Sequence, residues 1–296
     1  MDLFSMQYAV AVADQKSFSL AAQICGVTQS ALSQQISRLE KELGTVLFHR
    51  SSKAVTLTQA GEAFVRSARG ILQSAEALRE EMALYSGLRK GQLRLGIITS
   101  LECIHFGDML SAFCRTYPEI SVSITQSGTH RLSQLLEDRE IDAALINRPP
   151  NGLRSTLSCL RLGDDRYSLA VPAIHHLAGR KSVSLRELKE ERFIFHQPGQ
   201  VASELCLAAC REAGFEPKIV CRSENPSVAL YMVQGGLGVA FLPSEDFYSR
   251  TLSRVREVPI REPIIKEVVA AWRRDNASPL VAAFTDFSRE WGKEKI

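Results

Sequence analysis

The chain of 296 residues lacks the features that mark several large protein classes. It has no apolar run long enough to cross a bilayer, no internal repeat and no low-complexity segment. Its N-terminus has no basic start followed by an apolar core and a small-residue cleavage site, so we expect no signal peptide. These absences predict a mature cytosolic protein that makes no use of a membrane.

Sequence signatures of common enzymes are also missing. Neither GxSxG nor HExxH occurs, so hydrolase chemistry has no support. The glycine-rich run GGLGVAF at 235–241 follows an expected helix and precedes an expected strand, which is the wrong order for a nucleotide-binding loop. We therefore predict no catalytic residue, no cofactor and no enzymatic activity, and we interpret this run as a helix end that turns into a strand.

Metal and disulfide signatures are weak. The seven cysteines are an odd number and form no CxxC pair, which excludes a zinc ribbon or a thioredoxin-like motif. In a reducing compartment we expect free, buried thiols. The pair His175-His176 has no other ligand at a suitable spacing, so we expect a surface turn there and predict no metal site.

Three stretches with different patterns make up the chain. Residues 1–57 are typical of short helices with tight turns, and residues 58–89 are typical of one long helix. From residue 91 onward, short apolar strands alternate with helices, which indicates βαβ units and a parallel sheet. The fold class is therefore mixed, with a helical N-terminal part, a long linker helix and an α/β C-terminal part. A net charge of +3 is too small to identify a partner.

The long helix carries a narrow apolar seam. Thr58 is its expected N-cap, and Gly87 and Gly91 mark its end and a domain boundary. Apolar residues then recur at alternating spacings of four and three, which is a heptad pattern that favours packing against a second copy. The alternative is an amphipathic helix that lies on its own domain. The seam residues are Phe64, Ala68, Ile71, Ala75, Leu78, Met82 and Tyr85.

The segment VTQSALSQQISRLEKELG, residues 27–44, predicts a helix with two unlike faces. Thr28 is a good N-cap, and Val27 and Leu32 are placed to form a hydrophobic staple. Upstream, Ser19 is expected to cap a short helix that ends at Gly26. Helix, glycine turn and capped helix make a helix-turn-helix. The expected buried face is Leu32, Ile36, Leu39 and Leu43, and the opposite face is Ser30, Ser33, Gln34, Ser37, Arg38 and Lys41.

The polar face is rich in short hydroxyl and amide side chains, which are poor choices for helix propensity alone. Such side chains reach base edges and phosphates in the major groove of double-stranded DNA. The run LFHRSSKAVTLTQAG then predicts a small β wing with Arg50 and Lys53 at its turn, where they would meet phosphates or the minor groove. A solvated loop is the alternative for this segment.

Residues 8–64 resemble the LysR-type transcriptional regulators almost position by position. The matching residues are Ser17-Phe18, Ala21-Ala22, Thr28-Gln29, Ala31-Leu32-Ser33, Leu39-Glu40, Leu43-Gly44, Leu47-Phe48, Arg50, Leu57-Thr58 and Ala60-Gly61. One departure is Ser30, where the family often has Pro, and this loss is mild because Pro there would only preset the first helical turn.

The resemblance implies a division of the whole chain. Residues 1–57 would form a winged helix-turn-helix, residues 58–90 a linker and dimerisation helix, and residues 91–296 a sensor with two lobes like a periplasmic binding protein. Lobe I would span 91–161 and 268–296, and lobe II 162–267. The DNA contacts would come from Ser17, Thr28, Gln29, Ser30, Ser33, Gln34, Ser37, Arg38, Arg50 and Lys53.

The same resemblance implies a small-molecule effector between the two lobes. Its partners would be promoter DNA, a second copy of the chain through the linker helix, a tetramer built from such dimers, and RNA polymerase. Arg131 and Arg148 hint at an anionic effector. The expected effector-binding residues follow strand ends or open helices, and they are Thr99, Ser100, Gly128, Thr129, Asn147, His196, Gln197, Gln200 and Ser203.

Two other functions remain open. CREAGF at 210–215 resembles a cysteine-containing segment of peroxide-sensing members of the family, but their second reactive cysteine would fall near Val201. Cys206 and Cys210 are spaced i, i+4 on an expected helix, a geometry that keeps their sulfurs too far apart for an easy disulfide. A thiol-based redox regulator is thus the main alternative. A solute-binding protein or enzyme built on the α/β half is the other.

Overall fold

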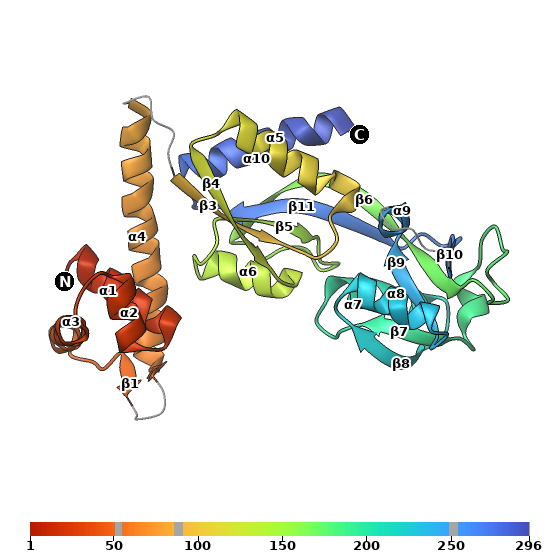
Figure 1. The fold of residues 1–296 in the computed structure, drawn as a ribbon, viewed down its shortest axis with the longest axis horizontal. Helices are drawn as coiled ribbons and strands as arrows, with labels where there is room; N and C mark the ends of the chain where they lie inside the picture. The colour runs from red at the N-terminus through yellow and green to blue at the C-terminus, as the bar shows by residue number, and fades with distance from the viewer. Residues whose placement is uncertain (51–54, 86–90, 249–253, 296) are drawn as a thin grey trace. The chain divides into compact units, whose positions relative to one another are not determined.

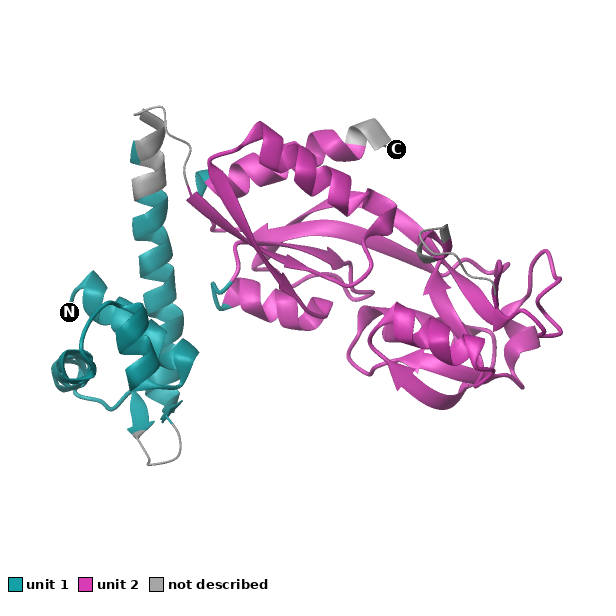
Figure 2. Ribbon diagram, viewed as in Figure 1, with its two compact units in different colours: residues 1–88, 138–140, 277–279 teal, residues 89–137, 141–276, 280–296 magenta. Residues whose placement is uncertain are grey.

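The computed structural model describes residues 1–50, 55–85, 91–248 and 254–295 (Figure 1). The chain forms two compact units (Figure 2). One unit contains residues 1–88 with 138–140 and 277–279, and the other contains the remaining residues. Among the described residues, no helix has both the length and the apolar character needed to span a membrane.

The N-terminal unit is a winged helix-turn-helix, as the sequence predicts. Helices α1, Leu3–Gln15, and α2, Phe18–Ile24, precede α3, Gln29–Leu43. Strands β1, Phe48–Arg50, and β2, Val55–Leu57, then pair antiparallel and form the two sides of the wing.

Three side chains cap these helices. Asp2 accepts a hydrogen bond from the Ser5 amide, and Thr28 accepts one from the Ala31 amide. Ser17 caps α2 by accepting from the Leu20 amide, so the prediction that Ser19 is this cap is wrong. The helix begins two residues earlier than expected because the extended backbone of Ser17 lets its own hydroxyl reach the first free amides.

The core of this unit lies between the three helices and the wing. Leu32, Ile36 and Leu39 are at most 1% exposed, as predicted, and they pack with the small residues of α2. Leu43 was predicted to join them but is 38% exposed. It is the last residue of α3, where Gly44 adopts a left-handed conformation and turns the chain away from the core.

The wing is held against the helices by polar contacts. The Glu40 carboxylate of α3 accepts from the backbone amides of Leu47 and Phe48, at 2.8 and 3.2 Å. Thr58 donates to the Val46 carbonyl and accepts from the Gly61 amide, so it is the predicted N-cap of the next helix. A Cβ at Gly61 would lie 2.1 Å from the Leu47 carbonyl oxygen, which is why only glycine fits there.

The long helix α4 runs from Gln59 to Tyr85. The predicted extension to residue 89 lies outside the described residues. Phe64 packs against the helix-turn-helix core and Ala68 is buried. This part of the seam fits the alternative of a helix that lies on its own domain. Further along the seam, the large apolar side chains of Ile71, Leu78 and Met82 are exposed. The side chain of Tyr85 lies outside the described part.

The first lobe of the C-terminal unit is a sheet with helices on both faces (Figure 1). Strands β3, Gly91–Ile97, β4, Ile120–Gln126, and β5, Ala143–Asn147, are parallel, and β11, Ile265–Arg273, pairs antiparallel with β5. The helices are α5, Phe106–Thr116, α6, Thr129–Glu137, and α10, Pro279–Lys295. Phe113 of α5 packs edge-on against Phe284 and Phe287 of α10.

The segment between β3 and α5 is not one continuous helix. A short 3₁₀ turn, Glu102–Ile104, follows the strand and is separated from α5 by His105. His105 has φ +49°, a left-handed conformation that no α-helix continues through. Thr99 and Ser100 therefore precede an irregular segment and do not begin an α-helix.

The second lobe repeats the sheet-and-helix pattern with other strands. Its strands are β7, Arg192–His196, β8, Lys218–Ser223, β9, Val239–Pro243, and β10, Val255–Val258. Its helices are α7, Val201–Glu212, α8, Pro226–Gln234, the short α9, Glu245–Tyr248, and a 3₁₀ turn, Leu185–Leu188. The run at 235–241 is a helix end followed by a strand, as predicted.

The long strand β6, Leu157–Pro172, belongs to both lobes. Its first part pairs with β11, and its last residues pair with β9 and β10. The apolar cores divide along it, because Leu157 and Leu162 pack in the first lobe and Tyr167, Leu169 and Val171 in the second.

A buried ion pair lies at this division. Asp165 of β6 and Lys266 of β11 are directly opposite each other, with 3.9 Å between Nζ and the carboxylate, and both side chains are at most 4% exposed. Lys266 also donates to the Ser100 carbonyl and hydroxyl oxygens, at 3.1 and 3.0 Å. Burial raises the pKa of the Asp165 carboxyl, while the nearby Lys266 charge opposes that rise.

We expect Lys266→Met to lower the free energy of unfolding of the C-terminal unit by about 3–5 kcal/mol, because it leaves a buried carboxylate without its cation. Adding Asp165→Leu should restore most of this loss, because the second change removes the uncompensated charge. Urea unfolding followed by tryptophan fluorescence measures both effects, since Trp272 and Trp291 pack in the first lobe. Equal midpoints for the single variant and the native protein would contradict the prediction.

Candidate DNA-binding surface and effector cavity

The start of α3 presents an exposed polar group of side chains. Thr28, Gln29 and Ser30 are exposed, and the Thr28 hydroxyl lies 3.1 Å from that of Ser30. Ser19 of α2 donates to Oε1 of Gln29 at 3.0 Å, so the preceding helix restrains this amide. An amide oxygen has two lone pairs, and Gln29 therefore keeps an acceptor as well as its N–H donors for a base edge.

The remaining predicted DNA contacts fall into three groups. Gln34, Ser37 and Arg38 are exposed along the same helix, while Ser33 is half-buried. Ser17 is half-buried, and its hydroxyl is engaged as the cap of α2. Arg50 was expected at the wing turn but is the last residue of strand β1; its side chain, like all of Lys53, lies outside the described part.

A cavity of about 340 Å³ lies between the two lobes of the C-terminal unit. This volume suits a small organic molecule. Seven of the nine predicted effector residues line it: Thr99, Ser100, Gly128, Thr129, Asn147, His196 and Gln200. Gln197 and Ser203 do not. Gln197 lies in the turn before α7, and Ser203 is 2% exposed on a face of α7 that the lobe itself covers.

Sequence reasoning missed several residues that line the cavity. They are Gln126, Ser127, Tyr167, Glu224, Asn225 and Lys266, with apolar and proline neighbours. Lys266 could have been found, because a single lysine in the apolar run IIKEVVAAW is unusual for a buried strand. Tyr167 gave no signal, since its position at the cavity depends on how β6 passes from one lobe to the other.

The charges at the cavity differ from those expected. Arg131 and Arg148 are not among its lining residues, and Arg148 pairs with Glu267 at 3.3 Å. The charged side chains that do line it are Lys266 and Glu224. Because Asp165 lies beside Lys266, the cavity carries no excess positive charge from these groups. The two arginines therefore give no support to an anionic ligand.

His196 and Asn147 present unpaired acceptors at the cavity. Nε2 of His196 and Oδ1 of Asn147 are buried and have no hydrogen-bond partner among the described residues. The other ring nitrogen of His196 donates to the Phe241 carbonyl, and burial lowers the pKa of the imidazole to about 4. His196 is therefore neutral near pH 7 and offers Nε2 as an acceptor.

The cysteines of α7 are protected thiols. Cys206 and Cys210 are both buried and both free. Burial raises the pKa of Cys206 well above its ordinary value and that of Cys210 to about 12. Because the thiolate is the reactive form, neither sulfur is activated for oxidation.

Comparison with known proteins agrees with this architecture. Residues 3–62 match the bacterial regulatory helix-turn-helix protein, lysR family, and residues 86–293 match the LysR substrate binding domain. The chain is 29% identical over 287 residues to the transcriptional dual regulator GltC of Bacillus subtilis, covering 97% of this chain and 95% of GltC. It is 30% identical over 292 residues to the HTH-type transcriptional regulator BudR of Raoultella terrigena, covering 97% and 99%.

A solved structure extends the likeness to the whole fold. A full-length OxyR variant of Pseudomonas aeruginosa superimposes with a TM-score of 0.79 and 26% identity, covering 98% of this chain and 95% of that one. The helix-turn-helix, the long helix and the lobed α/β unit thus occur together in one related chain. By domain matches, full-length relatives and fold, this protein belongs to the LysR family of DNA-binding transcriptional regulators.

Proposed function

We propose that this regulator reads DNA with the N-terminal part of α3 and senses a neutral or zwitterionic small molecule in the cavity between its lobes. The observation that carries the sensing half is the pair of buried acceptors, His196 and Asn147, at that cavity. Ligand binding would favour one arrangement of the lobes over another and so change how the dimer holds its DNA-binding heads.

Exposure and restraint at the start of α3 support the DNA half. Thr28 and Ser30 present hydroxyls there, and Gln29 is restrained by Ser19 of the preceding helix. The first residues of the second helix of a helix-turn-helix are those that approach base edges. Arg38, further along, would contact phosphate or guanine. The wing residues Arg50 and Lys53 complete the proposed contact set with Ser17, Ser33, Gln34 and Ser37.

Gln29→Ala is expected to relax sequence preference by about 1–3 kcal/mol, because it removes the one side chain of this turn that can pair bidentately with adenine. Fluorescence anisotropy on DNA flanking the protein's own gene, and on random DNA at the same salt, measures the ratio of affinities. Gln35→Ala is the matched control, since Gln35 is exposed on α3 but flanks the proposed reading face. An equal loss on both DNAs would exclude base reading by Gln29.

The outer part of the α4 seam supports a homodimer. Ile71 is 45% exposed, Leu78 57% and Met82 51%. Large apolar residues in a heptad pattern usually pack against a second helix, so these side chains are available for a partner. Phe64 and Ala68 belong to the domain core or are buried, so the seam is shared between the domain and the proposed partner. Ile71, Ala75, Leu78, Met82 and Tyr85 form the main proposed dimer contact, with Phe64 and Ala68 continuing the seam into the domain. A tetramer of two such dimers is proposed from the likeness to the family.

We expect the double variant Leu78→Glu and Met82→Glu to be monomeric at concentrations where the native chain is dimeric, because two charges would be placed in an apolar interface. Sedimentation equilibrium measures the association constant. Ser74→Glu is the control, because Ser74 is exposed on the same helix outside the seam. A native-like dimer in the double variant would remove α4 from the interface.

The chemistry of the cavity supports a ligand with hydrogen-bond donors. A buried acceptor without a partner is costly, and a ligand N–H or O–H removes that cost at both His196 and Asn147. The hydroxyls of Thr99, Thr129 and Tyr167 and the ammonium of Lys266 can bind ligand oxygens. Amino acids, nucleosides and polyols have both kinds of group, whereas a simple carboxylate has no donor.

Thermal shifts measured with amino acids, nucleosides, polyols and simple carboxylates test whether the ligand has to carry hydrogen-bond donors. We expect a donor-bearing compound to raise Tm, and His196→Phe to weaken its binding by about 1–3 kcal/mol, because the acceptor is lost. Affinity should be constant between pH 5.5 and 8 and should fall as the pH approaches 4, where the imidazole gains a proton. Preferential stabilisation by simple carboxylates would contradict the proposal.

The thiols favour small-molecule control over redox control. Cys206 and Cys210 are buried with raised pKa values, and the second reactive cysteine that the family resemblance would require, near Val201, is absent. Unchanged DNA affinity after peroxide treatment is the result that we expect if the thiols have no redox role.

We further propose that the protein is a cytoplasmic regulator without enzymatic activity that acts with RNA polymerase at promoters. We also propose residues 1–57, 58–90 and 91–296 as its domains.

A further inference from the structure

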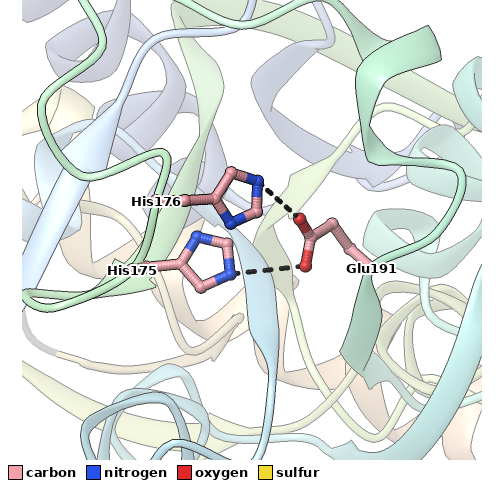
Figure 3. A group of neighbouring side chains, drawn as sticks. All are labelled: His175, His176 and Glu191. Atoms are coloured by element: carbon pink, nitrogen blue, oxygen red, sulfur yellow. Dashed lines mark ion pairs between the residues drawn. The ribbon is translucent and has the colours of Figure 1, made fainter.

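Two histidines and a glutamate come together on the second lobe, and none of the three lines the effector cavity. His175 and His176 lie in the turn that follows β6, and Glu191 immediately precedes β7 (Figure 3). The sequence spacing hid this cluster, because Glu191 is separated from the histidines by a loop that returns to them. The prediction of a plain surface turn there therefore overlooked a third ligand.

The three side chains converge on one point. Nε2 of His175 lies 3.3 Å from one carboxylate oxygen of Glu191, and Nε2 of His176 lies 3.4 Å from the other. One ligand atom from each residue falls within 4.8 Å of the others. Two ligands bound tetrahedrally to zinc, at bonds of 2.0–2.2 Å, are about 3.4 Å apart. Each of the two nitrogen–oxygen separations is close to that value, but the two are to different oxygens of Glu191. A single ligand oxygen therefore has to approach one of the nitrogens, and the two imidazoles each other, from separations that are already within 4.8 Å.

The donor set selects the class of ion. Imidazole nitrogens suit zinc, copper, nickel and cobalt, whereas magnesium and calcium prefer oxygen ligands. Two neutral imidazoles and one carboxylate leave a divalent ion with a net charge of +1. His175 and Glu191 are partly buried, at 19% and 15% side-chain exposure, while His176 is 67% exposed. The His175 and Glu191 side of the site is thus packed against the protein, and the His176 side is open to water.

Metal binding requires a small rearrangement at His175. Its Nδ1 accepts from the Leu177 amide at 3.4 Å, which leaves the proton of the neutral ring on Nε2. Coordination through Nε2 moves that proton to Nδ1 and gives up this contact. A hydrogen bond of that length is weak, so its loss is a minor cost beside two metal–nitrogen bonds.

We propose that His175, His176 and Glu191 form a binding site for a late first-row divalent metal, with zinc as the representative ion and water in the open coordination position. The ion would tie the turn after β6 to the residue before β7, and so close the loop of residues 177–190 at its base. None of its residues belongs to the proposed DNA contacts or lines the effector cavity, and bound metal would stabilise the second lobe.

Isothermal titration of Zn²⁺ into the full-length, chelator-stripped protein tests the site. We expect one equivalent per chain, with affinity weakened at least about tenfold in His175→Ala and in Glu191→Gln, and weakened in acid because protons compete for the ligands. Zinc should raise the Tm of the native protein and leave that of His175→Ala unchanged. Circular dichroism of the metal-free variants establishes that they are folded.

Two controls distinguish this site from others in the chain. His130→Ala removes a different His–Glu pair, with 2.8 Å between His130 and Glu204, and should leave the titration unchanged. Co²⁺ bound at the proposed site should show no thiolate charge-transfer absorption, because its ligands are nitrogen and oxygen. Full zinc affinity in His175→Ala, or an intense thiolate band with Co²⁺, would assign the metal to other residues and overturn the proposal.

Discussion

The C-terminal unit depends on one strand that serves two lobes. Because β6 pairs with β11 in its first part and with β9 and β10 at its end, one continuous strand connects the two lobes, and any change in their arrangement has to bend or twist it. The buried pair of Asp165 and Lys266 lies where the strand passes from one core to the other. Lys266 also donates to Ser100 and lines the cavity. The same side chain therefore contacts the strand shared by the lobes and the cavity where a ligand would bind.

This arrangement gives a physical route from ligand to conformation. A ligand that contacts Lys266, Thr99 or Ser100 from one side and His196 or Gln200 from the other bridges both lobes. Any difference in these contacts between two lobe arrangements becomes a difference in their populations. The neutral state of His196 makes it a constant acceptor across physiological pH, so proton concentration does not compete with the ligand there.

The DNA-binding unit relies on local contacts, which explains why its sequence was so informative. Caps act within three residues, as at Thr28, and the apolar period of α3 needs only the helix itself. Misassignments arose where two local solutions compete. Ser17 and Ser19 can both cap a helix, and the choice depends on where Phe18 packs. Leu43 fits the period but is exposed, because the chain turns at Gly44 before the helix face is covered.

Sequence alone determined the caps at Thr28 and Thr58, the apolar periods, and the alternation of strands and helices, because these features depend on neighbours a few residues apart. With them it determined the winged helix-turn-helix and the α/β class. Tertiary structure decided which polar groups meet. It placed Lys266 against Asp165 and Ser100, took Arg148 to Glu267 and away from the cavity, and brought Glu191 to His175 and His176. Those meetings join residues from 15 to 166 positions apart, and no local pattern encodes a contact across such separations.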